Sequence, residues 1–149
     1  MTHIERAMAL LAEHEDIDVL AHSSWIETEP MEGPPQDRYL NGAIKIKTTL
    51  LPLDLLSRLK MIERRLGRVK GEPNGPRPMD LDILFYDDVV IIDGKHLTIP
   101  HPRLAERWFV LKPLSEIALD WVHPRLKLTV QELLERVPAE AHESHSQTI

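Results

Sequence analysis

Two aspartates two positions apart, Asp80 and Asp82, are the residues whose type and spacing point most directly to chemistry. They follow a Gly-Pro-Arg-Pro turn and alternate with Leu81 and Ile83, which predicts a β-strand with its acids on one face. Two carboxylates about 7 Å apart repel each other unless a cation lies between them. Their hard oxygens, together with phosphate oxygens, suit Mg²⁺. The alternative is a solvated strand edge, but the guanidinium of Arg77 nearby favours a site for phosphate and metal.

The segment that leads to this acidic pair is basic. Between Arg58 and Arg77 lie seven Lys or Arg residues and two Glu residues, a local balance of +5 in a chain of formal net charge −6. A basic segment that runs into an acidic pair is what a phosphate-plus-metal site needs, and a solvated helix face is the alternative. The negative charge of the whole chain argues against a general nucleic-acid-binding surface.

The composition is that of an ordinary globular protein. The chain has 149 residues, 42% hydrophobic and 28% charged, so we expect one domain over residues 1–137 and a disordered polar tail over 138–149. It has no cysteine, which excludes a disulfide scaffold and thiolate chemistry. No apolar run approaches the ~18 residues of a membrane span, and no secretion pattern is visible, so we expect a cytoplasmic protein.

Hydrophobic periodicity and turn residues predict the order of the elements. The predicted elements are a helix over residues 3–14, strands over 17–26 and 39–48 joined by a proline-rich loop, a helix from Pro52 to Gly67, the strand after Gly75, a turn at Asp87-Asp88, extended pieces around Asp93-Gly94, and helices over 103–117 and 130–136. Pro113 is expected to break the 103–117 stretch into two helices. This order favours an α+β fold, an antiparallel sheet with helices packed on it, over a doubly wound parallel sheet.

Several separated blocks resemble the 6-hydroxymethyl-7,8-dihydropterin pyrophosphokinase family of folate biosynthesis. The blocks are Ser23-Ser24-Trp25, Tyr39-Leu40-Asn41, Gly67-Arg68-Val69, Gly75-Pro76-Arg77 with Asp80-Leu81-Asp82, Leu97 to His101, and Arg107 to Leu111. The resemblance implies a ferredoxin-like sheet and transfer of the β,γ-pyrophosphate of ATP to the hydroxymethyl group of the dihydropterin, leaving AMP.

The resemblance also implies roles for residues on the nucleotide side. Asp80 and Asp82 would hold two Mg²⁺ ions that bridge the triphosphate of ATP. The residues implied to contact the nucleotide are the phosphate clamps Arg68 and Arg77, the phosphate contacts His101 and Arg107, and Thr98 near the nucleoside. The alternatives are that His101 caps the next helix and that Arg107 pairs with Glu106.

On the other side, the resemblance implies that Tyr39 and Phe109 sandwich the pterin ring. Asn41 and Thr28 would hydrogen-bond its pyrimidine-like edge, where one amide can satisfy a donor and an acceptor. Ordinary core aromatics are the alternative for Tyr39 and Phe109. Glu63 is left open, as a support for the site or as a partner within its own helix.

The pattern also departs from the family. The family starts with a strand and a Gly-Ser-Asn-Leu-Gly type turn before its first helix, and the chain has neither ahead of residue 3. The expectation is that the native start lies upstream, or that another segment or a partner chain completes the sheet. Two competing functions remain: a catalytically silent nucleotide- or partner-binding module of the same fold, and an RNA-binding domain, which the charge and the lack of an aromatic platform disfavour.

Overall fold

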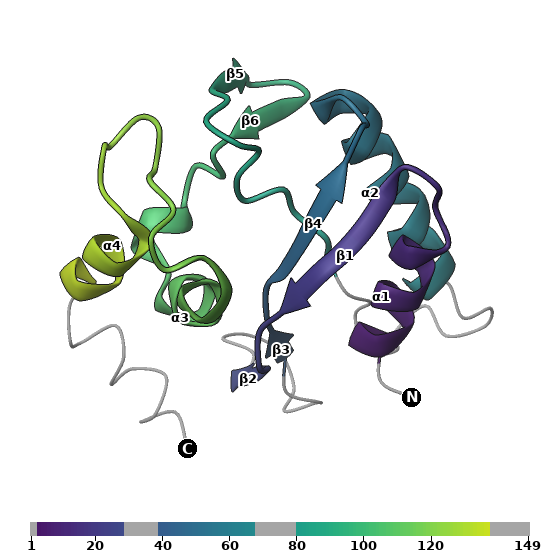
Figure 1. Cartoon of the computed structure of the whole chain (residues 1–149), viewed down its shortest axis with the longest axis horizontal. Coiled ribbons are helices and arrows are strands. Elements are labelled where there is room, and N and C mark those ends of the chain that lie inside the picture. The colour runs from purple at the N-terminus through teal and green to yellow at the C-terminus, as the bar shows by residue number, and fades with distance from the viewer. Residues whose placement is uncertain (1–2, 29–38, 68–79, 138–149) are drawn as a thin grey trace. The chain divides into compact units, whose positions relative to one another are not determined.

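The computed structural model describes residues 3–28, 39–67 and 80–137, and it contains helices and short strands (Figure 1). The elements are α1 (His3–Ala12), β1 (Ile17–His22), β2 (Ile26–Thr28), β3 (Tyr39–Asn41), β4 (Ile44–Thr48), α2 (Pro52–Gly67), β5 (Ile91–Asp93), β6 (Leu97–Ile99), the 3₁₀ helix η1 (Leu104–Glu106), α3 (Trp108–Ala118) and α4 (Val130–Arg136). The predicted α+β class is confirmed. The predicted tail over 138–149 lies outside the described residues.

The chain forms two compact units. The first unit comprises Met1–Leu20 and Lys45–Ile83, and the second comprises Ala21–Ile44 and Leu84–Ile149. The predicted single domain over 1–137 stays a prediction. Within the described ranges, no helix combines the length and the apolar character needed to cross a membrane.

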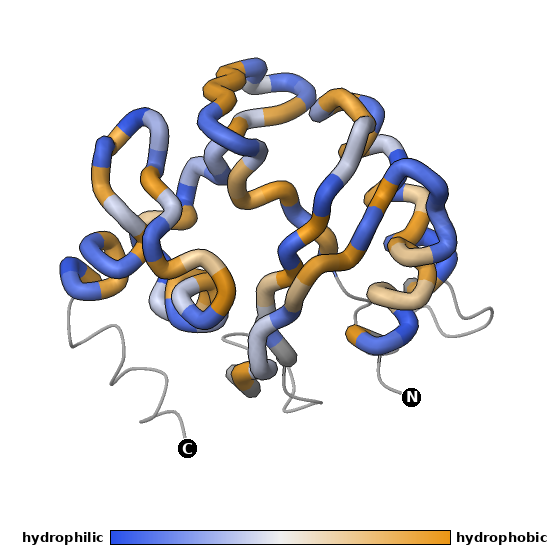
Figure 2. Tube along the Cα trace, in the orientation of Figure 1, coloured by the Kyte–Doolittle hydropathy of each residue, from blue (hydrophilic) through white to orange (hydrophobic). Residues whose placement is uncertain are grey.

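In the first unit, α1 packs against α2 through one apolar stripe of each helix. The buried residues of the two stripes are Ile4, Ala7 and Leu11 of α1 and Leu55, Leu59, Ile62 and Leu66 of α2. Their spacing of three or four positions places each set on one helical face, and hydrophobic and hydrophilic residues interleave along both helices (Figure 2). Strands β1 and β4, which lie mostly in this unit, pair with opposite directions (Figure 1).

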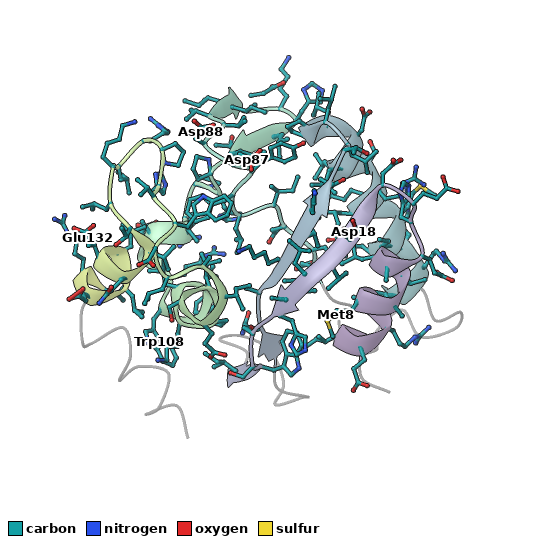
Figure 3. The ribbon with its side chains drawn as sticks, viewed as in Figure 1. Met8, Asp18, Asp87, Asp88, Trp108 and Glu132 are labelled. Atoms are coloured by element: carbon teal, nitrogen blue, oxygen red, sulfur yellow. The ribbon has the colours of Figure 1, made fainter. Side chains whose placement is uncertain are left out.

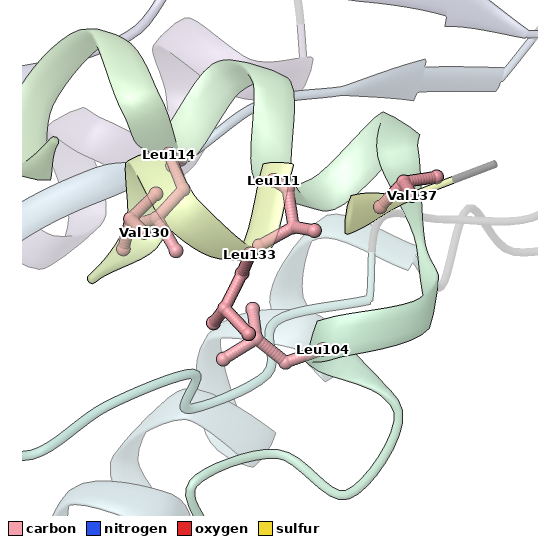
Figure 4. Close-up of a cluster of buried hydrophobic side chains, with 7 residues drawn as sticks. Leu104, Leu111, Leu114, Val130, Leu133 and Val137 are labelled. Atoms are coloured by element: carbon pink, nitrogen blue, oxygen red, sulfur yellow. The ribbon is translucent and has the colours of Figure 1, made fainter. Parts of the chain in front are cut away.

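The second unit has its core where η1, α3 and α4 meet. The buried side chains of this cluster are Ala43, Leu104, Leu111, Leu114, Val130, Leu133 and Val137, six of which are labelled in Figure 4. Leu84 and Phe85 pack against the same cluster. The core therefore fixes the first residues of the chain that follows the acidic pair and also fixes α3.

Two short antiparallel ribbons complete the second unit. In the first, β2 pairs with β3, and Ile26 lies opposite Asn41. In the second, β5 pairs with β6, and the hairpin turns after Asp93, as its Asp-Gly sequence predicts. The described strands thus form three two-stranded sheets rather than one continuous sheet.

Three predicted strands change in the structure. The strand predicted over 17–26 ends at His22 and resumes as β2, and the strand predicted over 39–48 divides into β3 and β4. The strand predicted after Gly75 is wrong for its described part, because Asp80–Tyr86 has no strand structure. A strand requires a hydrogen-bonded neighbour, and among the described residues no strand pairs with this segment.

The helices of the C-terminal part follow the sequence with one correction. The predicted break at Pro113 is wrong, because α3 continues through it. Pro113 is buried, and packing of this apolar ring offsets the lost helical hydrogen bond. The predicted helix over 130–136 is present as α4; Thr129 and Glu132 form a capping box at its start, and Figure 3 shows Glu132 in its first turn.

Candidate functional site

The candidate metal ligands lie in the first unit, on a segment with alternating exposure. Asp80 and Asp82 are exposed, Leu81 is half-buried, and Ile83 is buried. The predicted alternation of acidic and apolar residues is therefore present, although the backbone is not paired as a strand. Burial of Ile83 and partial burial of Leu81 anchor the segment and leave both carboxylates in solvent.

A side chain of α2 holds the backbone between the two aspartates. The backbone N–H of Leu81 donates a hydrogen bond to the carboxylate of Glu63. The same carboxylate forms an ion pair with Lys60, with 3.3 Å between Nζ and Oε1. Glu63, which the sequence left open, is thus both a helix partner and a support for the acidic pair. In the sequence, the signal for this support was the position of Glu63 four residues before Gly67, where α2 ends.

The two aspartates fit a metal that is also held by substrate. Among the described residues, no three His, Cys, Asp or Glu side chains form a group that could hold a metal ion. Mg²⁺ is commonly held by one or two carboxylates together with phosphate oxygens, so two exposed carboxylates are a suitable donor set for it. Arg68 and Arg77, the predicted phosphate clamps, lie outside the described residues.

The candidate nucleotide residues follow the β5–β6 hairpin of the second unit. Thr98 is the middle residue of β6, is half-buried, and pairs with Ile92. His101 comes two residues after β6, and its backbone N–H donates to the carbonyl of Leu84 at 2.9 Å. This bond attaches the segment to the chain that continues from the acidic pair.

The imidazole of His101 has a defined hydrogen bond on one side. Its Nδ1 accepts from the backbone N–H of Arg103 at 3.2 Å, just before η1 begins. The N-cap residue of η1 is Arg103, without a side-chain cap, so this bond is a local turn contact and His101 does not cap the helix. A neutral ring that accepts at Nδ1 carries its proton on Nε2, and Nε2–H is a donor suited to a phosphate oxygen. The predicted nucleotide role of His101 stays a prediction.

Arg107 and Phe109 lie together at the start of α3. Arg107 is the N-cap residue of the helix, with extended backbone, and its guanidinium carbon lies 5.8 Å from the centre of the Phe109 ring. Glu106, the alternative partner of Arg107, has Arg103 at 3.8 Å instead. The guanidinium thus rests on an aromatic face, and this contact does not neutralise its positive charge.

The candidate pterin residues on the strands share the β2–β3 ribbon. Position Thr28 lies opposite position Tyr39, and Asn41 lies two residues further along β3. Because alternate residues of a strand fall on one face and opposed residues share a face, these three positions form one row. Asn41 is half-buried. The side chains of Thr28 and Tyr39 lie outside what the structure describes.

Sequence reasoning missed a contact between the start of β2 and α3. The carboxylate of Glu116 accepts from the backbone N–H of Ser24 at 2.9 Å and from its hydroxyl at 2.8 and 3.0 Å. These bonds hold the pKa of Glu116 below its ordinary value, first through the Ser24 backbone N–H and then through its hydroxyl. The two residues are 92 positions apart, so the contact could not be read from local spacing. The signal in the sequence was that Glu116 follows Phe109 by two helical turns, which places both residues on one face of the predicted helix.

A second missed feature is the aromatic group around Phe85. The Phe85 ring stacks on Trp121 at 6.1 Å and meets the His123 ring edge-on at 5.7 Å. His123 is 7% exposed, and its Nδ1 accepts from the backbone N–H groups of Arg125 and Leu126. Burial first, and then the charge of Arg125, lower the pKa of His123. The ring therefore accepts two backbone hydrogen bonds from the residues that follow it and stabilises this turn of the chain.

Comparisons with known proteins agree with the resemblance in the sequence. The profile of the 7,8-dihydro-6-hydroxymethylpterin-pyrophosphokinase family matches residues 1–119. A 2-amino-4-hydroxy-6-hydroxymethyldihydropteridine pyrophosphokinase of Synechocystis sp. is 43% identical over 141 residues, which cover 95% of this chain and 71% of that protein. The Bacillus subtilis protein of the same name is 44% identical over 116 residues, or 78% of this chain and 69% of that protein.

A longer relative contains a similar region. The folic acid synthesis protein fol1 of Schizosaccharomyces pombe is 43% identical over 137 residues, which cover 92% of this chain and 19% of that protein. The chain therefore spans about a fifth of that relative and more than two thirds of the two bacterial ones. The predicted family is confirmed: the chain belongs to the 7,8-dihydro-6-hydroxymethylpterin-pyrophosphokinase family.

Proposed function

We propose that the chain transfers the pyrophosphoryl group of ATP to the hydroxymethyl group of 6-hydroxymethyl-7,8-dihydropterin, a step of folate biosynthesis. The family match over residues 1–119, which includes the Asp80-Leu81-Asp82 segment, carries this proposal. The alcohol oxygen attacks the β-phosphorus of ATP, the bond from that phosphorus to the α,β-bridging oxygen breaks, AMP leaves, and the alcohol proton is released. The products are AMP and the pterin diphosphate.

The residues on the nucleotide side position and neutralise the triphosphate. Phosphoryl-type transfer depends on placement and charge stabilisation more than on a covalent intermediate. Asp80 and Asp82 would hold Mg²⁺, two ions by the family resemblance, and bound Mg²⁺ neutralises phosphate charge. Arg68 and Arg77 would clamp the phosphates, and Thr98 would lie near the nucleoside. The guanidinium of Arg107 and the Nε2–H of His101 would contact phosphate oxygens.

The residues on the pterin side hold a flat ring. The row of positions Thr28, Tyr39 and Asn41 on the β2–β3 ribbon supports a surface on which a heterocycle can lie. In the proposal, Tyr39 and Phe109 sandwich the ring, and Asn41 and Thr28 recognise its edge. An aromatic sandwich fixes the plane of the ring, and the amide of Asn41 fixes its direction within that plane.

The proposal extends to the scaffold and the surroundings of the protein. We propose a ferredoxin-like arrangement, which the order α1, β1, β4 and α2 supports. The segment Asp80–Tyr86 has no strand neighbour among the described residues. The lack of a neighbour there supports the proposal that a further segment or a partner chain completes the sheet. A single domain over 1–137 and a cytoplasmic location stay predictions.

Release of AMP from ATP tests the proposed reaction. Purified protein is incubated with ATP and Mg²⁺, with and without hydroxymethyldihydropterin, and AMP and the pterin diphosphate are measured by chromatography. The expected result is equimolar formation of both products that requires the pterin and is lost with excess chelator. Binding of ATP with no AMP under any condition would favour the silent nucleotide-binding module instead.

A further inference from the structure

The exposed carboxylate of Glu116 on α3 binds Ser24, two residues before β2, the strand that carries the predicted pterin contact Thr28. We propose that Glu116 is a positioning residue, which sets the β2–β3 ribbon against α3 and so sets the width of the pterin site. It acts through Ser24 and does not itself touch the substrate. The inference rests on the proposed function, because the ligand whose site it adjusts is the dihydropterin.

The contact of Glu116 with Ser24 is specific in its geometry. One carboxylate oxygen accepts from both the backbone N–H and the hydroxyl of Ser24, and the other oxygen accepts from the hydroxyl. A backbone donor cannot rotate away, so this contact fixes the path of the main chain and not only the rotamer of Ser24. Hydrogen bonds to a charged acceptor are shorter and stronger than those between neutral groups.

The residues on both sides of Ser24 connect its position to the position of the strands. Ser23 is 1% exposed, and its backbone N–H donates to the carbonyl of Ala43 at 2.9 Å. Its hydroxyl accepts from the N–H of Ala43 at 2.9 Å and donates to the carbonyl of Ser24 at 2.7 Å. The backbone on either side of the Glu116 contact is therefore tied to the chain that follows β3.

Trp25, the next residue, fixes the same junction by packing. Its ring stacks on His22, with 5.3 Å between centroids, and lies so close to Gly42 that a Cβ there would be 2.0 Å from a ring carbon. Only glycine allows this approach. Strand β2 then begins at Ile26, which pairs with Asn41. A shift of Ser24 would thus be transmitted to β2 and to the Asn41 end of β3.

Glu116 lies on the same helix as Phe109, the residue predicted to stack on the pterin ring. Phe109 and Glu116 are seven residues apart on α3, which is two turns, so both lie on the same helical face. Helix α3 also contacts both β2 and β3. The face of α3 that carries Phe109 is therefore attached to the ribbon that carries Thr28, Tyr39 and Asn41.

Kinetics of Glu116→Ala test the inference, with Glu135→Ala as the matched control. Glu135 is an exposed glutamate on α4 of the same unit. For Glu116→Ala we expect the KM for the dihydropterin to rise about threefold to tenfold, the size of the loss of one ordinary hydrogen bond. The KM for ATP and the melting temperature should stay close to wild type, and Glu135→Ala should change none of the three.

Two further variants separate positioning from general stability. Glu116→Gln keeps an oxygen that can accept from Ser24, so it should restore part of the pterin affinity that Glu116→Ala loses. Ser24→Ala combined with Glu116→Ala should raise the pterin KM no more than Glu116→Ala alone, because both changes break one interaction. Equal losses for pterin and ATP, together with a lower melting temperature, would reduce Glu116 to a structural role and overturn the inference.

The outcomes also separate this inference from the proposed function. An active wild type with an unchanged pterin KM in Glu116→Ala overturns the inference alone. If the wild type does not turn over, equilibrium binding of the dihydropterin is measured with Mg²⁺ and a non-hydrolysable ATP analogue, and the same rise in Kd is expected for Glu116→Ala. A wild type that neither turns over nor binds the pterin overturns both.

Discussion

The Asp80–Ile83 segment of the first unit and the β2–β3 ribbon of the second unit are held in different ways. The first has exposed carboxylates, no strand neighbour among the described residues, and one carboxylate, that of Glu63, on its backbone. The ribbon is paired strand to strand and is tied at its base by Ser23 and Ser24. Substitutions of the exposed acids in the first region should therefore change chemistry with little change of stability, whereas substitutions in the buried core of the second unit should lower stability through lost packing.

Removal of one carboxylate of the acidic pair is the strongest test of this contrast. For Asp80→Ala, and likewise for Asp82→Ala, turnover should fall by at least about 10²-fold, the usual cost of removing one charge-stabilising group. Unfolding should change little, because both side chains are exposed. The measurements are AMP release and thermal unfolding, with Asp88→Ala, an exposed acid of the following turn (Figure 3), as control. Near-normal rates would remove the pair as metal ligands.

The opposite behaviour is expected in the core of the second unit. Leu111 is fully buried, so Leu111→Ala should lower the free energy of unfolding by about 2–5 kcal/mol. Leu119, just after the same helix, is 41% exposed, and Leu119→Ala should cost much less. Denaturant unfolding of both variants measures the difference. Equal costs would mean that the packing of α3 on α4 is not as the structure has it.

Glu63 provides a smaller test on the side of the acidic pair. Glu63→Gln weakens the acceptor for the Leu81 N–H, so the Mg²⁺ concentration for half-maximal rate should rise about threefold to tenfold. Lys60→Gln removes the ion pair of Glu63 but keeps that acceptor, and it should leave the Mg²⁺ dependence unchanged. A magnesium titration of the initial rate separates the two variants. The same shift in both would assign the effect to the ion pair.

The smallest expected effect is the acid sensitivity contributed by His123. Because the pKa of this His is lowered in the folded protein, the unfolded chain binds the proton first as the pH falls. Its contribution to stability is complete above the ordinary pKa of about 6.5 and is lost as the pH falls from there toward the lowered value. Between pH 7 and pH 5.5, the melting temperature should therefore fall further in the wild type than in His123→Gln. Identical pH profiles would contradict this account.

Local signals in the sequence were enough for most helices and for the family. Hydrophobic periodicity predicted α2, whose stripe of Leu55, Leu59, Ile62 and Leu66 is buried, and it also predicted the helix over 130–136, which begins with a local capping box at Thr129. Both depend on residues within a few positions of one another, and local rules apply to them. The α+β class followed from the order of the elements.

Strands and supports were harder to predict, because they depend on residues far apart in the chain. The alternation at Asp80–Ile83 indicated a strand, but alternation alone does not supply a neighbour. Pro113 was expected to end a helix, and burial in the core kept the helix intact. The roles of the candidate site residues stay predictions, most of them assigned by resemblance, because a role depends on which ligand atom a side chain meets.

The sequence by itself determined the family, the acidic pair with its alternation of acidic and apolar residues, and the helices whose apolar stripes form the two cores. Only the tertiary structure decided that Glu63 holds the backbone of the pair, that His101 accepts at Nδ1, and that Glu116 binds Ser24. The physical reason is that type and spacing fix what a side chain can donate or accept. Which donor it meets depends on the packing of segments up to 92 residues apart.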